Sequence, residues 1–175
     1  MLPAPRTDYK KRPMRDGLIR IDPPLYVART MLPCWRCRAH MPAIALVAPN
    51  VPEADGEICI LAQVEELPEV VLKFVRNRFP SFRLKYSKTL GSQYYANTCP
   101  KCGVLSGDFH LHSEPGAPFF PTTEEEAKHL TLEAVPLTGP ISVSAGLGMG
   151  AWNLILEHAR KVSGKQLAPA DGGRP

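Results

Sequence analysis

Two short stretches, Cys34-Trp-Arg-Cys37 and Cys99-Pro-Lys-Cys102-Gly103, decide what fold this 175-residue sequence can adopt. Each is a CxxC turn, which places two sulfur atoms on the same side of a tight loop. In the second turn Pro100 fixes φ, and Gly103 permits the left-handed backbone that lets amides approach the sulfurs. Two such turns supply four soft ligands, a set that suits tetrahedral Zn²⁺ with Zn–S distances of about 2.3 Å. We therefore predict one structural Zn²⁺ held by Cys34, Cys37, Cys99 and Cys102.

The separation of the two CxxC turns along the chain leaves other assignments open. There are 61 residues between Cys37 and Cys99, whereas zinc ribbons usually have about 15–20 residues between the pairs. Each pair could instead be a redox dithiol, or the two pairs could bind separate metals. The redox assignment needs a CxxC that opens a helix, and Val104-Leu-Ser-Gly-Asp does not resemble a helix start. The fifth cysteine, Cys59, lies in an apolar stretch and is predicted to be a small buried hydrophobic residue.

The segments that flank the CxxC turns predict the fold class. Residues 25–32 and 43–48 around the first turn, and 93–97 and 107–112 around the second, have the length and composition of strands. We therefore predict an α+β fold in which two hairpins, each tipped by a CxxC turn, form a zinc ribbon. The long insertion between them is predicted to contain a strand at 57–62, a helix at 68–79 and a strand at 82–86. In the last strand, Phe82, Leu84 and Tyr86 share the face that is expected to be buried.

Three further elements are predicted after Pro121. Thr122 with Glu125, or Thr123 with Glu126, forms a capping box that opens a short helix. Residues 141–143 form a strand, and the glycines of 146–150 form a tight turn that leads into a C-terminal helix at 152–162. Their spacing departs from the dinucleotide-binding fingerprint and does not predict a nucleotide site. The segments 1–17 and 163–175 are rich in Pro, Gly and charge, and are predicted to be flexible arms of a single domain at 18–162.

A longer stretch around the second turn resembles a known kind of protein. Tyr94-Tyr-Ala-Asn-Thr-Cys-Pro-Lys-Cys-Gly, followed by Gly107-Asp-Phe, is similar to a segment of little-characterised bacterial zinc-ribbon proteins from plasmid- or phage-associated settings. The upstream Cys34-Trp-Arg-Cys37 matches a Cys-Trp-x-Cys pair in these proteins. The resemblance covers residues 94–112 and the first turn. It implies a zinc-stabilised fold with the same four cysteine ligands, and it implies no established activity.

Composition excludes several other classes of protein. The chain is 44% hydrophobic and 22% charged, which is typical of a globular domain and not of a disordered or collagen-like chain. Its longest apolar run, residues 43–48, is far shorter than the roughly 20 residues of a membrane span. The first residues, Met1-Leu-Pro-Ala-Pro-Arg, do not resemble a signal peptide, so we expect a cytoplasmic protein.

The net charge of +4 is strongly segregated along the chain. Residues 41–69 hold six Asp and Glu and no Lys or Arg, whereas residues 70–107 hold seven Lys and Arg and no Asp or Glu. The two segments could neutralise one another across the fold, since charge runs are usually solvated faces. The basic segment, mixed with aromatic residues, could also bind a phosphate backbone. We predict that nucleic acid or a nucleic-acid-associated protein binds a basic surface formed by Lys73, Arg76, Arg78, Arg83, Lys85 and Lys88.

One cluster offers a catalytic alternative. If 107–112 is a strand, Asp108, His110 and His112 point to the same side and could hold a second, open metal site suited to hydrolysis. The same alternation is also typical of a polar stripe on a half-buried strand. No Ser or Cys lies in a recognisable nucleophile motif, so we predict a non-enzymatic zinc-binding adaptor. The third possibility is a protein-interaction or inhibitor factor of a mobile element that contacts its partner through the acidic residues 53–69 or the proline-rich ends.

Overall fold

The computed structural model describes residues 18–150 and 152–163. The predicted arm at 1–17 lies outside these residues, as does the predicted tail at 163–175 apart from its first residue, Ser163. The described elements have an α+β composition with many strands and few, mostly short, helices. This confirms the α+β part of the predicted fold class. Within the described ranges, none of the helices has the length and apolar character needed to cross a membrane.

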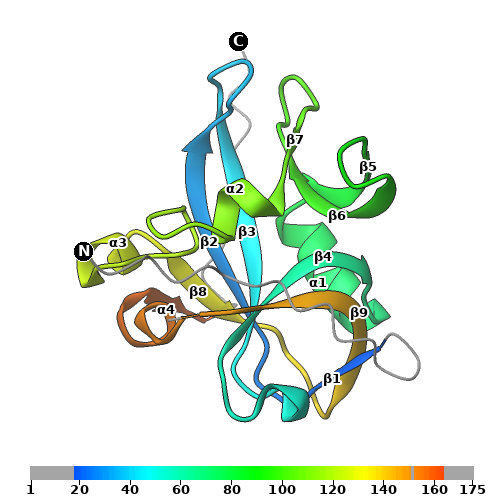
Figure 1. The fold of residues 1–175 in the computed structure, drawn as a ribbon, viewed down its shortest axis with the longest axis vertical. Helices are drawn as coiled ribbons and strands as arrows, with labels where there is room; N and C mark the ends of the chain where they lie inside the picture. Colours follow the sequence, from blue (N-terminus) through cyan, green and yellow to red (C-terminus); the bar gives the residue numbers. More distant parts are fainter. Residues whose placement is uncertain (1–17, 151, 164–175) are drawn as a thin grey trace, which may run out of the picture.

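A large sheet forms the centre of the molecule. Its strands are β1 (Ile19–Ile21), β2 (Tyr26–Pro33), β3 (His40–Ala48), β4 (Cys59–Glu66), β8 (Thr131–Ala134), β9 (Ile141–Met149) and β10 (Arg160–Val162). In the described part of the chain these seven strands follow the order β1-β9-β4-β3-β2-β8-β10. Neighbours are antiparallel except β8 and β10, which are parallel. The β2–β3 hairpin extends beyond the rest of the sheet toward one end of the molecule (Figure 1).

A second, three-stranded sheet lies beside this hairpin (Figure 1). It consists of β5 (Phe82–Ser87), β6 (Ser92–Thr98) and β7 (Leu105–Ser106), all antiparallel. The helices are the 3₁₀ turn η1 (Pro52–Ala54), α1 (Glu69–Arg78), α2 (Asp108–His112), α3 (Glu124–Lys128) and α4 (Asn153–His158). The two CxxC turns thus lie at the tips of two hairpins, β2–β3 and β6–β7, which belong to different sheets.

The apolar run at 43–48 is the central strand of the fold. Along β3, Ile44 and Leu46 belong to one cluster of buried side chains, and Ala45 and Val47 belong to another. Both faces of the strand are therefore covered, which explains why its sequence is continuously apolar and does not alternate. The first cluster includes the buried side of α1, and the second includes residues of α2 and α4. The helices therefore cover opposite faces of the main sheet.

The insertion has the predicted strand–helix–strand order, with a different buried face in its second strand. Helix α1 is preceded by Pro68, whose φ of −65° and extended ψ fit the residue that caps a helix. The i, i+3, i+4 spacing of apolar residues predicts a buried face with Leu67, Val70, Val71, Phe74 and Val75; the structure buries all of these except Val70, which is exposed. In β5, Phe82 is buried, but Leu84 and Tyr86 are exposed, so the prediction for that face is wrong beyond its first residue. Only the start of β5 reaches the first cluster of buried side chains, and its later residues form a projecting hairpin with β6.

Most of the predicted strand at 107–112 is a helix, and Gly107 precedes it in an extended conformation. Helix α2 begins at Asp108, and its buried residues are Asp108, Leu111 and His112. This three-and-four spacing is the helical period. The Asp108 carboxylate accepts a 2.6 Å hydrogen bond from the backbone N–H of Gln63 in β4. That contact with the main sheet, and burial of Leu111, favour the helix over the alternating pattern.

The predicted glycine turn at 146–150 is also wrong, because β9 continues to Met149 and pairs with β4. The glycines nevertheless serve close packing. A Cβ at Gly146 would lie 3.3 Å from the Ala62 carbonyl oxygen, and one at Gly150 would lie 3.2 Å from the Trp152 ring. Absence of a side chain at Gly148 and Gly150 lets Trp152 pack against the strand end, where its indole N–H donates to the Gly148 carbonyl at 2.9 Å.

The predicted C-terminal helix ends earlier than its apolar pattern indicates. Helix α4 stops at His158 because Ala159 adopts an extended conformation, and residues 160–162 form β10. The backbone of β10 pairs with the otherwise free side of β8, and these sheet hydrogen bonds replace another turn of helix. Upstream, the short helix α3 confirms one of the two capping-box alternatives. Thr123 accepts from the Glu126 N–H, and the Glu126 carboxylate accepts from the Thr122 N–H.

Candidate metal centre

The two CxxC turns have the same backbone hydrogen bonds, and we call them the first knuckle (residues 34–38) and the second knuckle (residues 99–103). In the first, Cys34 N–H donates to the Ala39 carbonyl and Arg38 N–H donates to the Cys34 carbonyl. In the second, the corresponding donors are Cys99 and Gly103. Gly103 has the predicted positive φ, 70°. The chain therefore folds the same local turn twice.

The first knuckle needs a positive φ without a glycine, a requirement that the sequence analysis missed. Arg38 occupies the position of Gly103 and has a φ of 61°. A non-glycine residue in this region carries backbone strain. One feature of the sequence could have indicated this conformation: Arg38 directly follows the second cysteine of its CxxC pair, as Gly103 does in the other pair.

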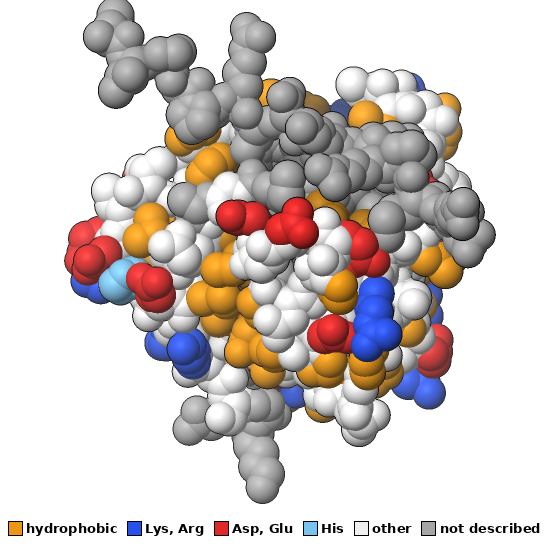
Figure 2. All heavy atoms as spheres, turned by 60° about the horizontal axis from the view of Figure 1, so that its bottom comes forward, with side chains coloured by type: hydrophobic (Ala, Val, Ile, Leu, Met, Phe, Trp, Pro, Cys, Tyr) orange, Lys and Arg blue, Asp and Glu red, His pale blue; other side chains and the backbone are white. Residues whose placement is uncertain are grey.

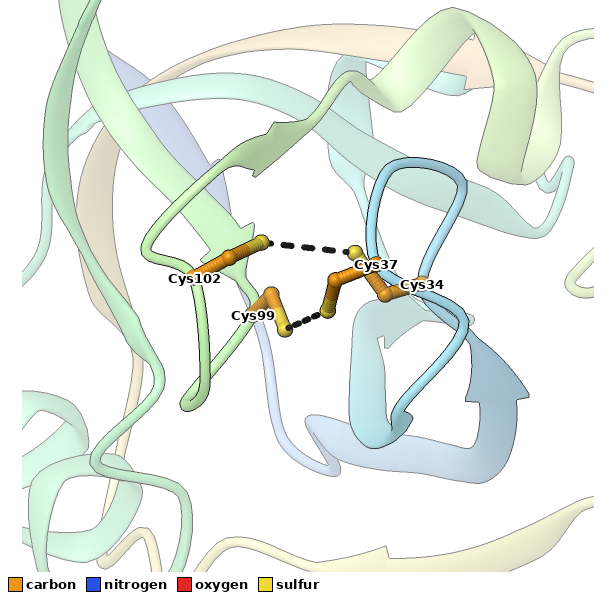
Figure 3. A group of neighbouring side chains, drawn as sticks. All are labelled: Cys34, Cys37, Cys99 and Cys102. Carbon is orange, nitrogen blue, oxygen red and sulfur yellow. Dashed lines mark hydrogen bonds between the residues drawn. The ribbon is translucent and has the colours of Figure 1, made fainter.

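The four cysteines from the two knuckles come together as one group (Figure 3). Their sulfur atoms all lie within 4.8 Å of one another. The Sγ atoms of Cys34 and Cys102 are 3.7 Å apart, and those of Cys37 and Cys99 are 3.6 Å apart. A tetrahedral site with Zn–S bonds of about 2.3 Å requires S–S separations of about 3.8 Å. A disulfide requires about 2.05 Å. The arrangement is that of four metal ligands and not of two disulfides.

The donor set and these separations are compatible with a single Zn²⁺. Four thiolates form the closed, tetrahedral set that is typical of structural zinc sites. No protein-family model, curated protein or solved structure matches this chain. The assignment of the metal therefore depends on the chemistry and geometry of these four side chains.

Backbone hydrogen bonds prepare part of this group for a cation. The Cys37 N–H donates to the sulfur of Cys34 and lowers the pKa of that thiol to about 6. The Cys102 N–H lowers the pKa of Cys99 in the same way. At Cys102 the Val104 N–H also lowers the pKa, but burial and the three neighbouring sulfurs outweigh it and raise the pKa to about 11. Four thiolates at these distances repel one another, so their complete deprotonation requires a bound cation.

Packing encloses the centre. Cys34 and Cys99 are fully buried and form a small cluster with the buried side chain of Met41, flanked by Leu32 and Val104. The Trp35 indole N–H donates to the Leu105 carbonyl at 3.0 Å and joins the first knuckle to the strand that follows the second. Four protein ligands and an apolar surround leave no position for a reacting water, which is the pattern of a structural site.

Asn97 explains how cysteines so far apart in sequence meet. Its side-chain oxygen accepts from the Ile44 N–H at 2.8 Å, and its side-chain nitrogen donates to the Ile44 carbonyl at 2.9 Å. This buried pair of hydrogen bonds joins β6 to β3. Cys99 follows two residues later, so the amide fixes the second knuckle beside the first hairpin. Asn97 belongs to the stretch that resembles other zinc-ribbon proteins, but nothing in the sequence indicates its hydrogen bonds with Ile44, which is 53 residues away.

The predicted second metal cluster does not form among the described residues. On helix α2, Asp108 and His112 lie on the buried side with 3.8 Å between the carboxylate and Nε2, whereas His110 is exposed. The cysteine group is the metal-binding cluster found among residues 18–150 and 152–163. The strand geometry on which the hydrolase alternative rested is therefore wrong.

The structure separates the six predicted basic residues into different environments. Arg78 is directed inward, where its guanidinium pairs with buried Glu133 at 2.9 Å and covers the Phe74 ring at 4.3 Å. Lys73 lies 3.8 Å from Glu69 on the same helix. Of the other four, Lys85 is half-buried, and the remaining three are exposed: Arg76, Arg83 and Lys88. Arg78 is thus a structural residue.

Cysteine reactivity gives a direct test of these assignments. We expect alkylation of native, metal-loaded protein at neutral pH to be slow at all five cysteines. Removal of the metal by a chelator should release its four ligands, and Cys59 should become reactive only as the fold is lost, because burial raises the pKa of its thiol to about 11 and so suppresses thiolate at neutral pH. In the native protein, the rate of alkylation of Cys59 should rise only as the pH approaches about 11. Mass spectrometric mapping of the labelled sites measures this, and early labelling of Cys59 would contradict it.

Proposed function

We propose that this chain is a non-enzymatic zinc-ribbon adaptor that binds nucleic acid through exposed cations on and around the knuckle-bearing hairpins. Zinc would act structurally, by holding the two hairpins side by side. The proposal takes its main support from the distribution of charge over these elements. From residue 70 to residue 107, a range that includes the second knuckle, the chain has seven cations and no acidic residue.

The exposed members of this set lie on four parts of the chain. Lys73 and Arg76 are on α1, Arg83 is on β5, Lys88 is in the β5–β6 turn and Lys101 is in the second knuckle. The first knuckle adds Arg36 and Arg38, which are also exposed. On the face of the molecule seen in Figure 2, by contrast, the described Lys and Arg side chains stand apart among acidic and hydrophobic ones. Exposed cations on both knuckles and on the neighbouring β5–β6 hairpin favour an anionic partner.

Salt dependence would distinguish this activity from other kinds of binding. About five phosphate contacts on a single strand predict a slope of log K against log salt concentration near −3.5. Changing both Arg83 and Lys88 to Glu should weaken binding at least about tenfold and make the slope shallower by about 1.4, since two contacts are lost. Fluorescence anisotropy with a labelled oligonucleotide across a salt series measures both quantities.

A matched variant controls for net charge. Changing Arg20 and Lys161 to Glu alters the charge by the same amount at exposed positions on β1 and β10, outside the basic segment. We expect this control to bind almost as well as the native chain, and both variants to retain one zinc per chain. Equal weakening by the two variants, or binding that is insensitive to salt, would refute the proposed surface.

A further inference from the structure

A cavity of about 720 Å³ lies directly beside the metal centre. We call it the knuckle groove. Its walls come from both knuckle-bearing hairpins, the β5–β6 turn, β4 and α2. They include Trp35, Leu90, Tyr94, Ser106, Phe109 and His110. A space of this size accommodates a small organic group but not a nucleic-acid duplex.

The groove has exposed aromatic walls. Trp35 is 61% exposed and Phe109 is 56% exposed, whereas the other tryptophan, Trp152, is fully buried. The hydrogen bond from the Trp35 indole to Leu105 holds the ring while leaving most of its surface open. A large exposed indole within a CxxC turn, together with a second exposed ring that lines the same groove, indicates a surface that contacts a ligand. Flat rings of this kind are platforms on which nucleobases stack.

The floor of the groove is preorganised. Asp108 and Gln63 both line it, and the 2.6 Å hydrogen bond between them attaches α2 to the main sheet. Gln63 has a φ of 49°, a backbone conformation that favours glycine, at a position where the pairing of β4 with β9 is irregular. Backbone strain of this type persists where the surrounding structure holds the residue in place, and strained residues are concentrated at binding sites.

Charge around the groove favours an anionic ligand with a π-system. Exposed Arg36 follows Trp35 in the chain, and exposed Lys88 lies between Ser87 and Thr89, both of which line the groove. The acidic residue among the lining side chains, Asp108, already accepts from Gln63 and lies 3.8 Å from His112. Cations at the rim suit phosphates, and aromatic walls with nearby hydroxyls suit bases.

We infer that the knuckle groove binds one or two unstacked bases of single-stranded nucleic acid, with the flanking phosphates at Arg36 and Lys88. This inference rests on the proposed function and specifies its ligand. A single strand is required because the bases of a duplex are stacked and paired and cannot enter the cavity.

The test uses a ~12-nucleotide oligothymidylate and an abasic strand of the same length, which keeps the phosphates and lacks the bases. Because Trp152 is buried, quenching of tryptophan emission reports on Trp35. We expect saturable quenching by oligothymidylate, and binding of the abasic strand that is weaker by about fivefold or more. Trp35→Ala and Phe109→Ala should each weaken oligothymidylate binding by a similar factor, measured by anisotropy, and leave abasic binding unchanged. Trp35→Phe should retain most of the affinity.

Met31→Ala is the matched control, because Met31 is 58% exposed on the same hairpin and does not line the groove. Zinc content checks that each variant is folded, and Phe109→Ala leaves the Trp35–Leu105 hydrogen bond intact. Equal affinity for the two strands would overturn the base site while leaving the proposed function standing. Absence of binding to both at low salt would overturn both proposals. If a peptide quenches the emission of Trp35 and oligothymidylate does not, the groove binds protein, and the inference is overturned.

Discussion

A Cys99→Ser variant is expected to lose its zinc and with it the folded state. Cys99 is fully buried, and its sulfur lies 3.6 Å from that of Cys37. A structural zinc contributes about 10–16 kcal/mol of apparent binding free energy. The net stability of a domain is only about 5–15 kcal/mol, so loss of the metal leaves little or nothing to maintain the fold. Metal analysis of the purified protein, together with thermal unfolding by circular dichroism, measures both effects.

Cys59→Ala provides the matched comparison for this variant. Cys59 is also fully buried, but it lies in the core of the main sheet, away from the knuckles. The substitution removes one sulfur from a core position and should lower stability by about 1 kcal/mol, with one zinc per chain retained. A native-like Cys99→Ser protein, or fresh native protein without stoichiometric zinc, would refute the shared metal site.

Replacing Arg78 by Ala is expected to destabilise the protein by about 3–5 kcal/mol, because it leaves the carboxylate of Glu133 buried without its cation. Glu133 is 1% exposed, and its second oxygen accepts no hydrogen bond from the described residues. For a chain of this size, the change corresponds to a decrease in Tm of about 6–20 °C. Thermal and urea unfolding measure it.

Two further variants separate the ion pair from other roles of Arg78. Arg76→Ala, at an exposed position on the same helix, should change stability by no more than about 0.5 kcal/mol. Combining Arg78→Met with Glu133→Leu removes both charges and should recover most of the lost stability, since apolar groups of similar size replace buried ion pairs well. A mild effect of Arg78→Ala, or a double variant no more stable than the single one, would show that the pair is not structural.

The metal centre and the central strand were predictable because their signals are local. A CxxC turn fixes the relation between two ligands within four residues, and the continuous apolar run of β3 indicates a strand that is buried on both faces. The capping box at Thr123 and Glu126 is similarly self-contained. In each case the residues that define the feature are also the residues that make its contacts.

Features that depend on distant partners were not predictable. The pattern at 108–112 fits a strand, and it becomes a helix because Asp108 finds the Gln63 N–H on another element. The glycines of β9 resemble a turn until β4 and Trp152 are placed against them. Arg78 resembles a surface cation until Glu133, 55 residues later, is found beneath it. The alternation of polar and apolar residues does not encode these pairings.

The two hydrogen bonds between Asn97 and Ile44 have a consequence for how the chain reaches its native state. A metal held by all four cysteines would close a loop of 61 residues between Cys37 and Cys99, and the entropy lost in closing a loop of this length must be offset for the fourth ligand to bind. Docking of β6 on β3 places the second knuckle beside the first, so the contacts of the Asn97 amide offset part of this entropy. Docking of the two hairpins and binding of the ion are therefore expected to be coupled, because each lowers the entropic cost of the other.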